Sequence, residues 1–171
     1  MDKFWGVLVA VLVVGSALVG MFRSWSARRT RDAHIELAES LDSGETFWTG
    51  RLQYVASTRA SEKLDRLAIR GGAFRGWADM RVSSTGISIQ VQGEPVILIP
   101  AHALLGVTTD SWTIDRGTGA EGLVRLHWTP ESPIDFEIYS FLRVTDATEQ
   151  TRLLDALVHL SSPQQTTEPR A

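Results

Sequence analysis

An uncharged apolar stretch from Phe4 to Phe22 constrains this chain more than any other feature. It holds 19 residues without a charge or a proline, and Ser16 carries its only hydroxyl group. At a rise of about 1.5 Å per residue, a helix of this length covers roughly the ~30 Å hydrocarbon core of a bilayer. Trp5 and Trp25 lie near its two ends, where aromatic side chains favour the membrane–water interface. The sequence therefore predicts one transmembrane helix.

The charges that flank this stretch predict its orientation. Lys3 is the one base before it, whereas four arginines follow it before the first acid, namely Arg23, Arg28, Arg29 and Arg31. Because positive charge collects on the cytoplasmic side, we expect a single-pass protein of the cell membrane with its N-terminus outside and its C-terminal domain in the cytoplasm. Residues 1–31 carry five Lys/Arg and one acid. This basic collar suits anionic headgroups, although it could equally serve only as a topology signal.

A cleaved secretory signal is the alternative reading of the same stretch. Small residues near Ser24 to Ala27 would offer a cleavage site. Two observations argue against it: the apolar core exceeds the ~7–15 residues usual for a signal, and arginines crowd the start of the would-be mature chain. An uncleaved anchor is the interpretation we prefer.

The remaining 140 residues carry twelve Lys/Arg and nineteen acids, a net charge of −7. Such a domain does not bind nucleic acid through bulk charge. The chain has no cysteine, which excludes disulfides, thiolate metal ligands and cysteine nucleophiles. One domain besides the anchor fits this length.

The order of predicted elements after the anchor is mostly β. Residues 32–45 are acidic, and Ile35, Ala38 and Leu41 recur three apart, which suggests a juxtamembrane helix (over Thr30 to Ser43) or a linker. Alternating and β-branched segments bounded by turn residues then predict seven short strands of a sandwich or barrel within residues 46–160. These strands cover residues 46–57, 77–83, 86–92, 96–99, 104–114, 123–128 and 134–141.

A single helix is predicted to close the domain. Thr145 or Asp146 can cap it, and its apolar stripe comprises Leu153, Leu154, Leu157, Val158 and Leu160. Residues 161–171 are polar with two prolines and should be a disordered tail.

Seven strands followed by one helix is the order of a pleckstrin-homology (PH) domain. The chain also resembles actinobacterial membrane proteins with one N-terminal helix and a PH-like domain, through Tyr54, Ser57-Thr58, Leu64-Asp65-Arg66, Arg75-Gly76, Gly86 and Ile99-Pro100. This resemblance implies two sheets packed at an angle, an open corner filled by the last helix, and a binding or scaffolding role. Some similar proteins are labelled transporters, but one helix does not form a transport path without partners.

The stretch from Arg51 to Arg75 has a net charge of +4 inside the acidic domain. In PH domains the loop between the first two strands commonly supplies cations for phosphate groups, so the resemblance makes this loop a candidate contact for anionic lipid or a protein partner. The usual basic-x-Arg pair on the second strand is missing, which argues against a specific phosphoinositide site, and plain solvated or ion-paired charge is the ordinary reading. The candidate residues are Arg59, Lys63, Arg66, Arg70 and Arg75.

The sequence gives little support to catalysis or to a cofactor. The four histidines, His34, His102, His127 and His159, lack metal-binding spacing, and Asp135 with Glu137 fits a solvated strand face. We therefore predict no metal, no cofactor and no enzyme activity. The predicted function is a membrane-anchored binding or scaffolding module with a protein partner. The alternative is an accessory subunit of a transport or export complex, whose helix packs through Gly15, Ser16 and Gly20.

Overall fold

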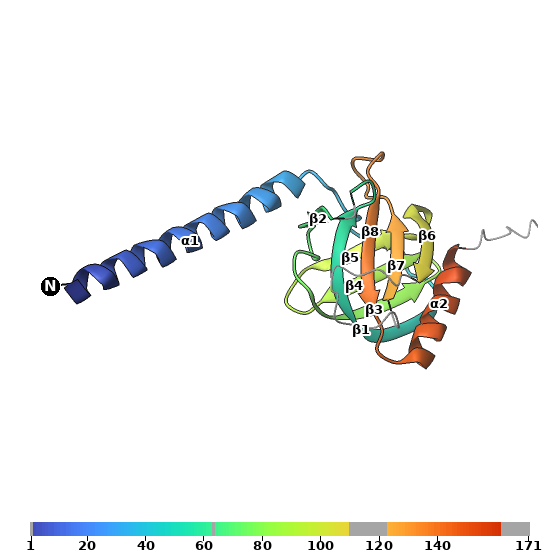
Figure 1. Cartoon of the computed structure of the whole chain (residues 1–171). Coiled ribbons are helices and arrows are strands. Elements are labelled where there is room, and N and C mark those ends of the chain that lie inside the picture. Colours follow the sequence, from blue (N-terminus) through green and yellow to red (C-terminus); the bar gives the residue numbers. More distant parts are fainter. Residues whose placement is uncertain (1, 63, 110–122, 162–171) are drawn as a thin grey trace, which may run out of the picture.

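The computed structural model describes residues 2–62, 64–109 and 123–161. It consists of a long N-terminal helix that projects from a curved, mostly β domain with one C-terminal helix (Figure 1). The elements are α1 (Asp2–Asp32), β1 (Thr46–Arg59), β2 (Arg66–Leu67), β3 (Gly76–Ser83), β4 (Gly86–Val91), β5 (Val96–Pro100), η1 (Ala101–Ala103), β6 (Leu104–Thr109), β7 (Leu123–Trp128), β8 (Ile138–Arg143) and α2 (Ala147–Ser161).

The strands form one antiparallel sheet in the order β5-β4-β3-β1-β8-β7-β6. Strand β1 joins its two halves, since Thr46–Tyr54 pairs with β3 and Gln53–Arg59 pairs with β8. The register shifts between Tyr54 and Ala56, at the point where β1 passes from one partner to the other. In the described ranges no ladder joins β5 to β6, so the sheet is curved but not closed.

The predicted fold class, a mostly-β antiparallel domain with one C-terminal helix behind an apolar N-terminal helix, is confirmed. The hairpin of β3 and β4 shows why the alternating pattern was informative: Ile87, Ile89 and Val91 are buried on one face. Two strand predictions need correction. β8 begins at Ile138 rather than Ile134, because residues 133–136 form a turn closed by the Phe136 N–H and the Pro133 carbonyl at 3.1 Å. The two-residue β2, which pairs with β1 at Ser57 and Thr58, was not predicted.

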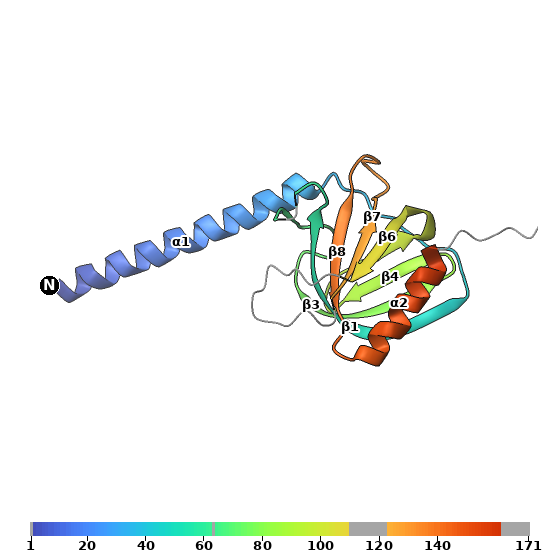
Figure 2. The same ribbon diagram turned by 45° about the vertical axis from the view of Figure 1, so that its right-hand side comes forward.

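Helix α2 closes one open end of the sheet, next to β6, β1 and β3 (Figure 2). Asp146 caps it by accepting bonds from the N–H groups of Thr148 and Glu149 at 2.8 and 3.0 Å. Its buried face consists of Leu153, Ala156, Leu157 and Leu160. Val158 is 58% exposed, so its expected place in the apolar stripe is wrong, and Ala156 occupies the core in its stead.

The segment between α1 and β1 is not helical. Helix α1 ends at Asp32, and residues 33–45 run without regular structure over the domain to the β3–β4 turn, so the predicted helix over Thr30 to Ser43 is wrong. The Glu36 N–H donates to the Ser132 carbonyl at 2.9 Å, and the Thr85 hydroxyl donates to the Asp42 carbonyl at 2.8 Å. We call residues 33–45 the strap. Ile35 and Ala38 of the strap are 6% and 8% exposed and belong to the core, which long-range contacts rather than local helix propensity decide.

Among the described residues, one helix is long and apolar enough to cross a membrane, judged by length and composition. It covers Trp5–Ser24, and none of that stretch is buried against the domain. The expected strand end at residues 110–114, the glycine-rich loop that follows and the expected disordered tail from residue 162 lie outside the described residues.

Candidate functional site

The C-terminal end of α1 is tied to the domain through a buried carboxylate. Asp32, the last residue of α1, is 2% exposed. Its Oδ2 accepts a hydrogen bond from the backbone N–H of Ala68 at 2.7 Å, directly after β2. The Arg31 guanidinium donates to both oxygens of the same carboxylate at 2.7 and 3.3 Å. A negative charge at the C-terminal end of a helix interacts unfavourably with the helix dipole, and its burial costs solvation energy. The hydrogen bonds from Ala68 and Arg31 offset these costs.

Arg31 also connects α1 to the loop between β1 and β2. Its Nη1 donates to Asp65 Oδ1 at 2.9 Å, and Arg59 Nε lies 3.7 Å from Asp65 Oδ2. The hydrogen bond to Asp32 is the main reason that the pKa of Arg31 is raised, and the bond to Asp65 adds to it while desolvation opposes it. Arg59 lies over the Phe136 ring, 4.5 Å from its centroid. Two of the bases at this end of the domain are therefore paired with one carboxylate.

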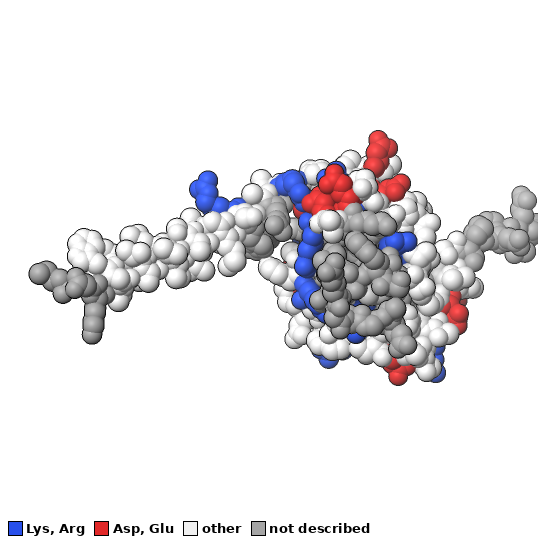
Figure 3. All heavy atoms as spheres, viewed as in Figure 1, with Lys and Arg blue, Asp and Glu red and all other residues white. Residues whose placement is uncertain are grey.

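The candidate basic residues fall into two groups. Arg59 contacts Asp65 and Phe136, and Arg66 donates to the Val55 carbonyl at 3.3 Å, so both take part in holding the loop. Arg70 and Arg75 are exposed, whereas Lys63 lies outside the described residues. Figure 3 shows Lys and Arg atoms along the side of the domain nearest α1. Arg59 and Arg66 therefore lie in or next to the loop that contacts the end of α1, and Arg70 borders the same groove as Asp32.

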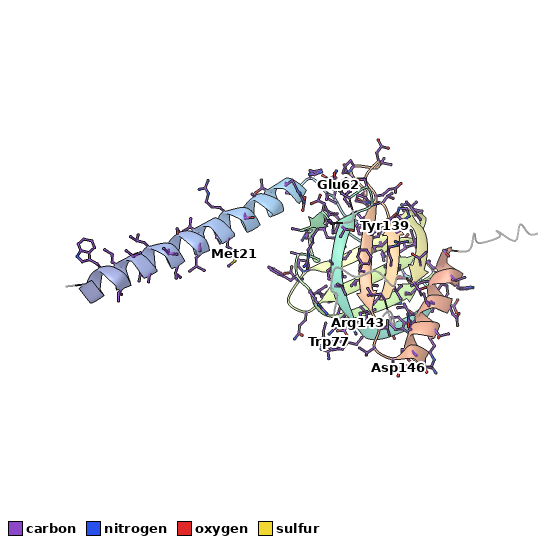
Figure 4. The ribbon with its side chains drawn as sticks, in the orientation of Figure 1. Met21, Glu62, Trp77, Tyr139, Arg143 and Asp146 are labelled. Carbon is purple, nitrogen blue, oxygen red and sulfur yellow. The ribbon has the colours of Figure 1, made fainter. Side chains whose placement is uncertain are left out.

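Distances along α1 indicate how near this loop would lie to a bilayer. Asp32 lies eight positions after Ser24, the end of the apolar span. At about 1.5 Å per residue they extend about 12 Å. A headgroup layer is roughly 5–8 Å thick on each side, so the loop would lie within about one Debye length of it. Figure 4 shows Glu62, in the same loop, next to the C-terminal end of α1 and far from Asp146 at the start of α2.

Of the expected membrane-interface residues, Trp5 is 63% exposed on α1, and Arg23 is exposed at the end of the span. Arg31 is the residue of that group which the structure shows in contact with the domain. The side chains of Trp25, Arg28 and Arg29 lie outside the described part of the chain.

A buried polar network holds the second half of the β1–β3 connection. The Tyr54 hydroxyl lies 2.8 Å from Ser57 Oγ and 3.1 Å from the Gly72 carbonyl oxygen. Ser57 Oγ lies 2.6 Å from Ser140 Oγ, which accepts from the Trp128 indole N–H at 2.9 Å. The Trp128 indole can only donate and the Gly72 carbonyl can only accept. All three hydroxyl groups are therefore satisfied when each group donates to the next, in the order Trp128, Ser140, Ser57, Tyr54 and Gly72. Burial raises the pKa of Tyr54 to about 12.

The remaining candidates do not form a site. His127 pairs with Glu137 at 2.9 Å on the exposed surface, and Asp135 and Glu137 precede β8 instead of sharing its face. His159 packs edge-on against Phe47, and His34 packs edge-on against Phe136. Among the described residues no group of three His, Asp or Glu side chains is placed to hold a metal ion.

The residue that sequence reasoning missed is Asp32. It appeared as the first acid after the basic collar, whereas it is the buried link between α1 and β2. The sequence places the neighbouring Arg31 at the membrane interface, and its partner Asp65 enters only through the Leu64-Asp65-Arg66 resemblance and the charge count. The available signal is the Arg31-Asp32 pair at the end of a helix, but Asp65, the partner of Arg31, lies more than thirty residues away in the chain.

Comparisons with known proteins bear on this arrangement. The model of the bacterial PH domain-like family matches residues 38–158. The search of curated proteins gave no match. Among solved structures, a chain of the 8S snRNP assembly intermediate aligns with a TM-score of 0.49 at 9% identity, covering 78% of this chain and 97% of that one. The N-terminal PH domain of human ARAP2 aligns with a TM-score of 0.41 at 14% identity, covering 78% and 94%. Since the family model spans well over half of the sequence, the chain belongs to the bacterial PH domain-like family.

Proposed function

We propose that this protein is a single-pass, membrane-anchored binding module whose domain presents the β1–β2–β3 side to anionic headgroups on the cytoplasmic face. One observation carries the proposal: Asp32 and Arg31 tie the end of the apolar helix to Ala68 and Asp65. A helix that spans the membrane would thereby hold the basic loop at the surface instead of letting the domain drift on a free tether.

The charge distribution supports lipid contact at this side in particular. The domain as a whole is acidic, so an anionic surface repels it on average. Exposed Arg70 and Arg75 lie on the connection from β2 to β3, and Arg70 follows Ala68, which bonds to Asp32, by two residues. Each cation close to an anionic surface contributes about 1 kcal/mol, and a few such contacts are enough to set the tilt of a domain already confined there.

The experiment uses the absence of cysteine in the natural chain. A single cysteine replaces Leu64, which is 76% exposed in the β1–β2 loop, and is spin-labelled in the full chain in nanodiscs. We expect a relaxing agent attached to lipid headgroups to reach this label more in anionic than in neutral nanodiscs. The matched label replaces Asp155 on the exposed side of α2 and should not respond.

Arg70→Gln with Arg75→Gln should remove the lipid dependence, and so should high salt, because the Debye length falls to about 3 Å at 1 M. A Leu64 label that stays equally distant from headgroups in both kinds of nanodisc would contradict the proposal. In that case the apolar surface of α1 becomes the better candidate for partner binding, as in an accessory subunit.

A further inference from the structure

The edge of the sheet at β5 borders a groove that adjoins the proposed lipid-facing side. β5 pairs with β4 from Gly86↔Pro100 to Gln90↔Val96, and in the described ranges it has no second strand partner. A groove of about 890 Å³ lies between β5, the start of the strap and residues 68–73. An unpaired edge leaves backbone N–H and C=O groups able to bind another extended chain.

The apolar part of the groove comes from alternate residues of β5. Ile97 and Ile99 are 1% and 0% exposed in the core, so Val96 and Leu98 point the other way and line the groove. Val96 is 41% exposed. Pro95 and Pro100 bracket the strand, which limits the open edge to a length that suits one short segment instead of an extending sheet.

The rim of the groove is acidic. Four of its carboxylates come from the strap, from the turn before β5 and from the β7–β8 turn: Glu36, Glu39, Glu94 and Glu131. Of the described residues that line the groove, Arg70 is the one base, and Asp32 is already paired with Arg31 and the Ala68 N–H. An occupant that balances this rim carries lysine or arginine.

The walls are held in place on both sides. The strap is bonded to the β7–β8 turn through Glu36 and Ser132, and Gly71 approaches the Pro95 carbonyl so closely that a side chain would collide with it. Gly71 also has φ +85°, a conformation that glycine adopts without strain. The groove is therefore already formed in the absence of a ligand, which lowers the entropic cost of adding a strand.

We infer that this groove binds an extended, basic segment of a partner protein as an added strand on β5. Main-chain hydrogen bonds to the β5 edge would supply affinity, apolar residues of the segment would contact Val96 and Leu98, and its lysines or arginines would face the four glutamates. Arg70 belongs both to this groove and to the proposed lipid-facing side, whereas β5 and the four glutamates belong to the groove alone, so the inference does not depend on lipid binding.

The test uses the full chain in nanodiscs of neutral lipid, which a basic peptide does not bind by charge. The probe is a fluorescent peptide of alternating lysine and valine, compared with its glutamate counterpart and with a version N-methylated at alternate residues. We expect binding of the first peptide and loss of binding for the other two, because one lacks charge complementarity and the other lacks edge donors.

A variant with Glu36→Gln, Glu39→Gln and Glu131→Gln should weaken binding about tenfold, since three exposed charge pairs together contribute on that order. The matched control removes three exposed acids elsewhere, at Glu45, Glu62 and Asp155, and should leave affinity unchanged. Amide hydrogen exchange should slow at β5 and not at β6, the opposite edge of the sheet. Equal binding of the N-methylated peptide, equal loss in both variants, protection at β6 instead of β5, or no binding at low salt would overturn the inference.

Discussion

Asp32 and Ala68 are joined by a 2.7 Å hydrogen bond between a buried carboxylate and a backbone N–H, across 36 positions of sequence. This bond fixes where the long helix leaves the domain. Asp32→Ala should lower the free energy of unfolding by about 1.5–3 kcal/mol, because it removes a charged acceptor and leaves a part-buried donor unpaired. Urea titration of the full chain in detergent, followed by near-UV circular dichroism, measures the loss. Asp42→Ala, at an exposed strap position, is the control and should stay within about 0.5 kcal/mol.

The strap should be part of the folding unit. Ile35 is 6% exposed, and burial of such a side chain contributes about 1.5–3 kcal/mol. A soluble fragment of residues 31–161 should therefore be at least that much more stable than a fragment of residues 46–161. Denaturant titration of both decides it, and equal midpoints would show that the strap only lies on the surface.

Helix α2 offers a pair of neighbouring positions with opposite environments. Leu157 is 0% exposed and Val158 is 58% exposed. Leu157→Ala should cost about 2–5 kcal/mol through lost transfer energy and the cavity it leaves. Val158→Ala is the matched control, expected within about 0.5 kcal/mol. Similar losses at both positions would mean that α2 does not pack as described.

Tyr54 should make stability depend on alkaline pH. Its pKa is about 12 in the fold and about 10 in an unfolded chain. The folded state holds the phenol proton more tightly than the unfolded state. The resulting contribution to the free energy of unfolding is about 2–3 kcal/mol; it is fully present below pH 10 and is lost as the pH rises towards 12. The measurement is the difference in unfolding free energy between the natural chain and Tyr54→Phe at intervals from pH 8 to 12. A difference that stays constant over this range would refute the buried neutral phenol.

The proposed orientation can be tested with reporters fused after Ser161, the last described residue of α2. A cytoplasmic reporter should be active there, because the arginines after the span hold that side in the cytoplasm. Replacement of Arg23, Arg28 and Arg29 by glutamine should reduce this preference. Activity of a reporter that works only outside the membrane would reverse the orientation, and a mature protein that starts near Ala27 would exclude the anchor.

Local patterns predicted the strands and the closing helix well, whereas contacts between distant segments decided what was missed. Alternation in β4 and the Asp146 cap of α2 are encoded within a few residues. The strap has Ile35 and Ala38 at a spacing that also suits a helix, and its partners are Ser132 and Thr85. For the candidate site, the charge count predicts a basic stretch, but it does not predict that Asp65 engages Arg31 and Arg59 together. Likewise, an acidic rim assembled from three separate segments has no signature in a single stretch of sequence.

The strap does not act as a flexible linker between α1 and the domain. In the proposed membrane arrangement, this affects how the domain encounters a partner. A domain on a long flexible linker samples a hemisphere of cytoplasm, so its local concentration at the membrane surface is low. Here the strap is bonded along its length to the β7–β8 and β3–β4 turns, so the domain stays in a thin layer and diffuses in two dimensions with its helix. A rotation of α1 about its own axis would then turn the domain with it about the membrane normal. The orientation of the helix would therefore set the direction in which the groove at β5 faces.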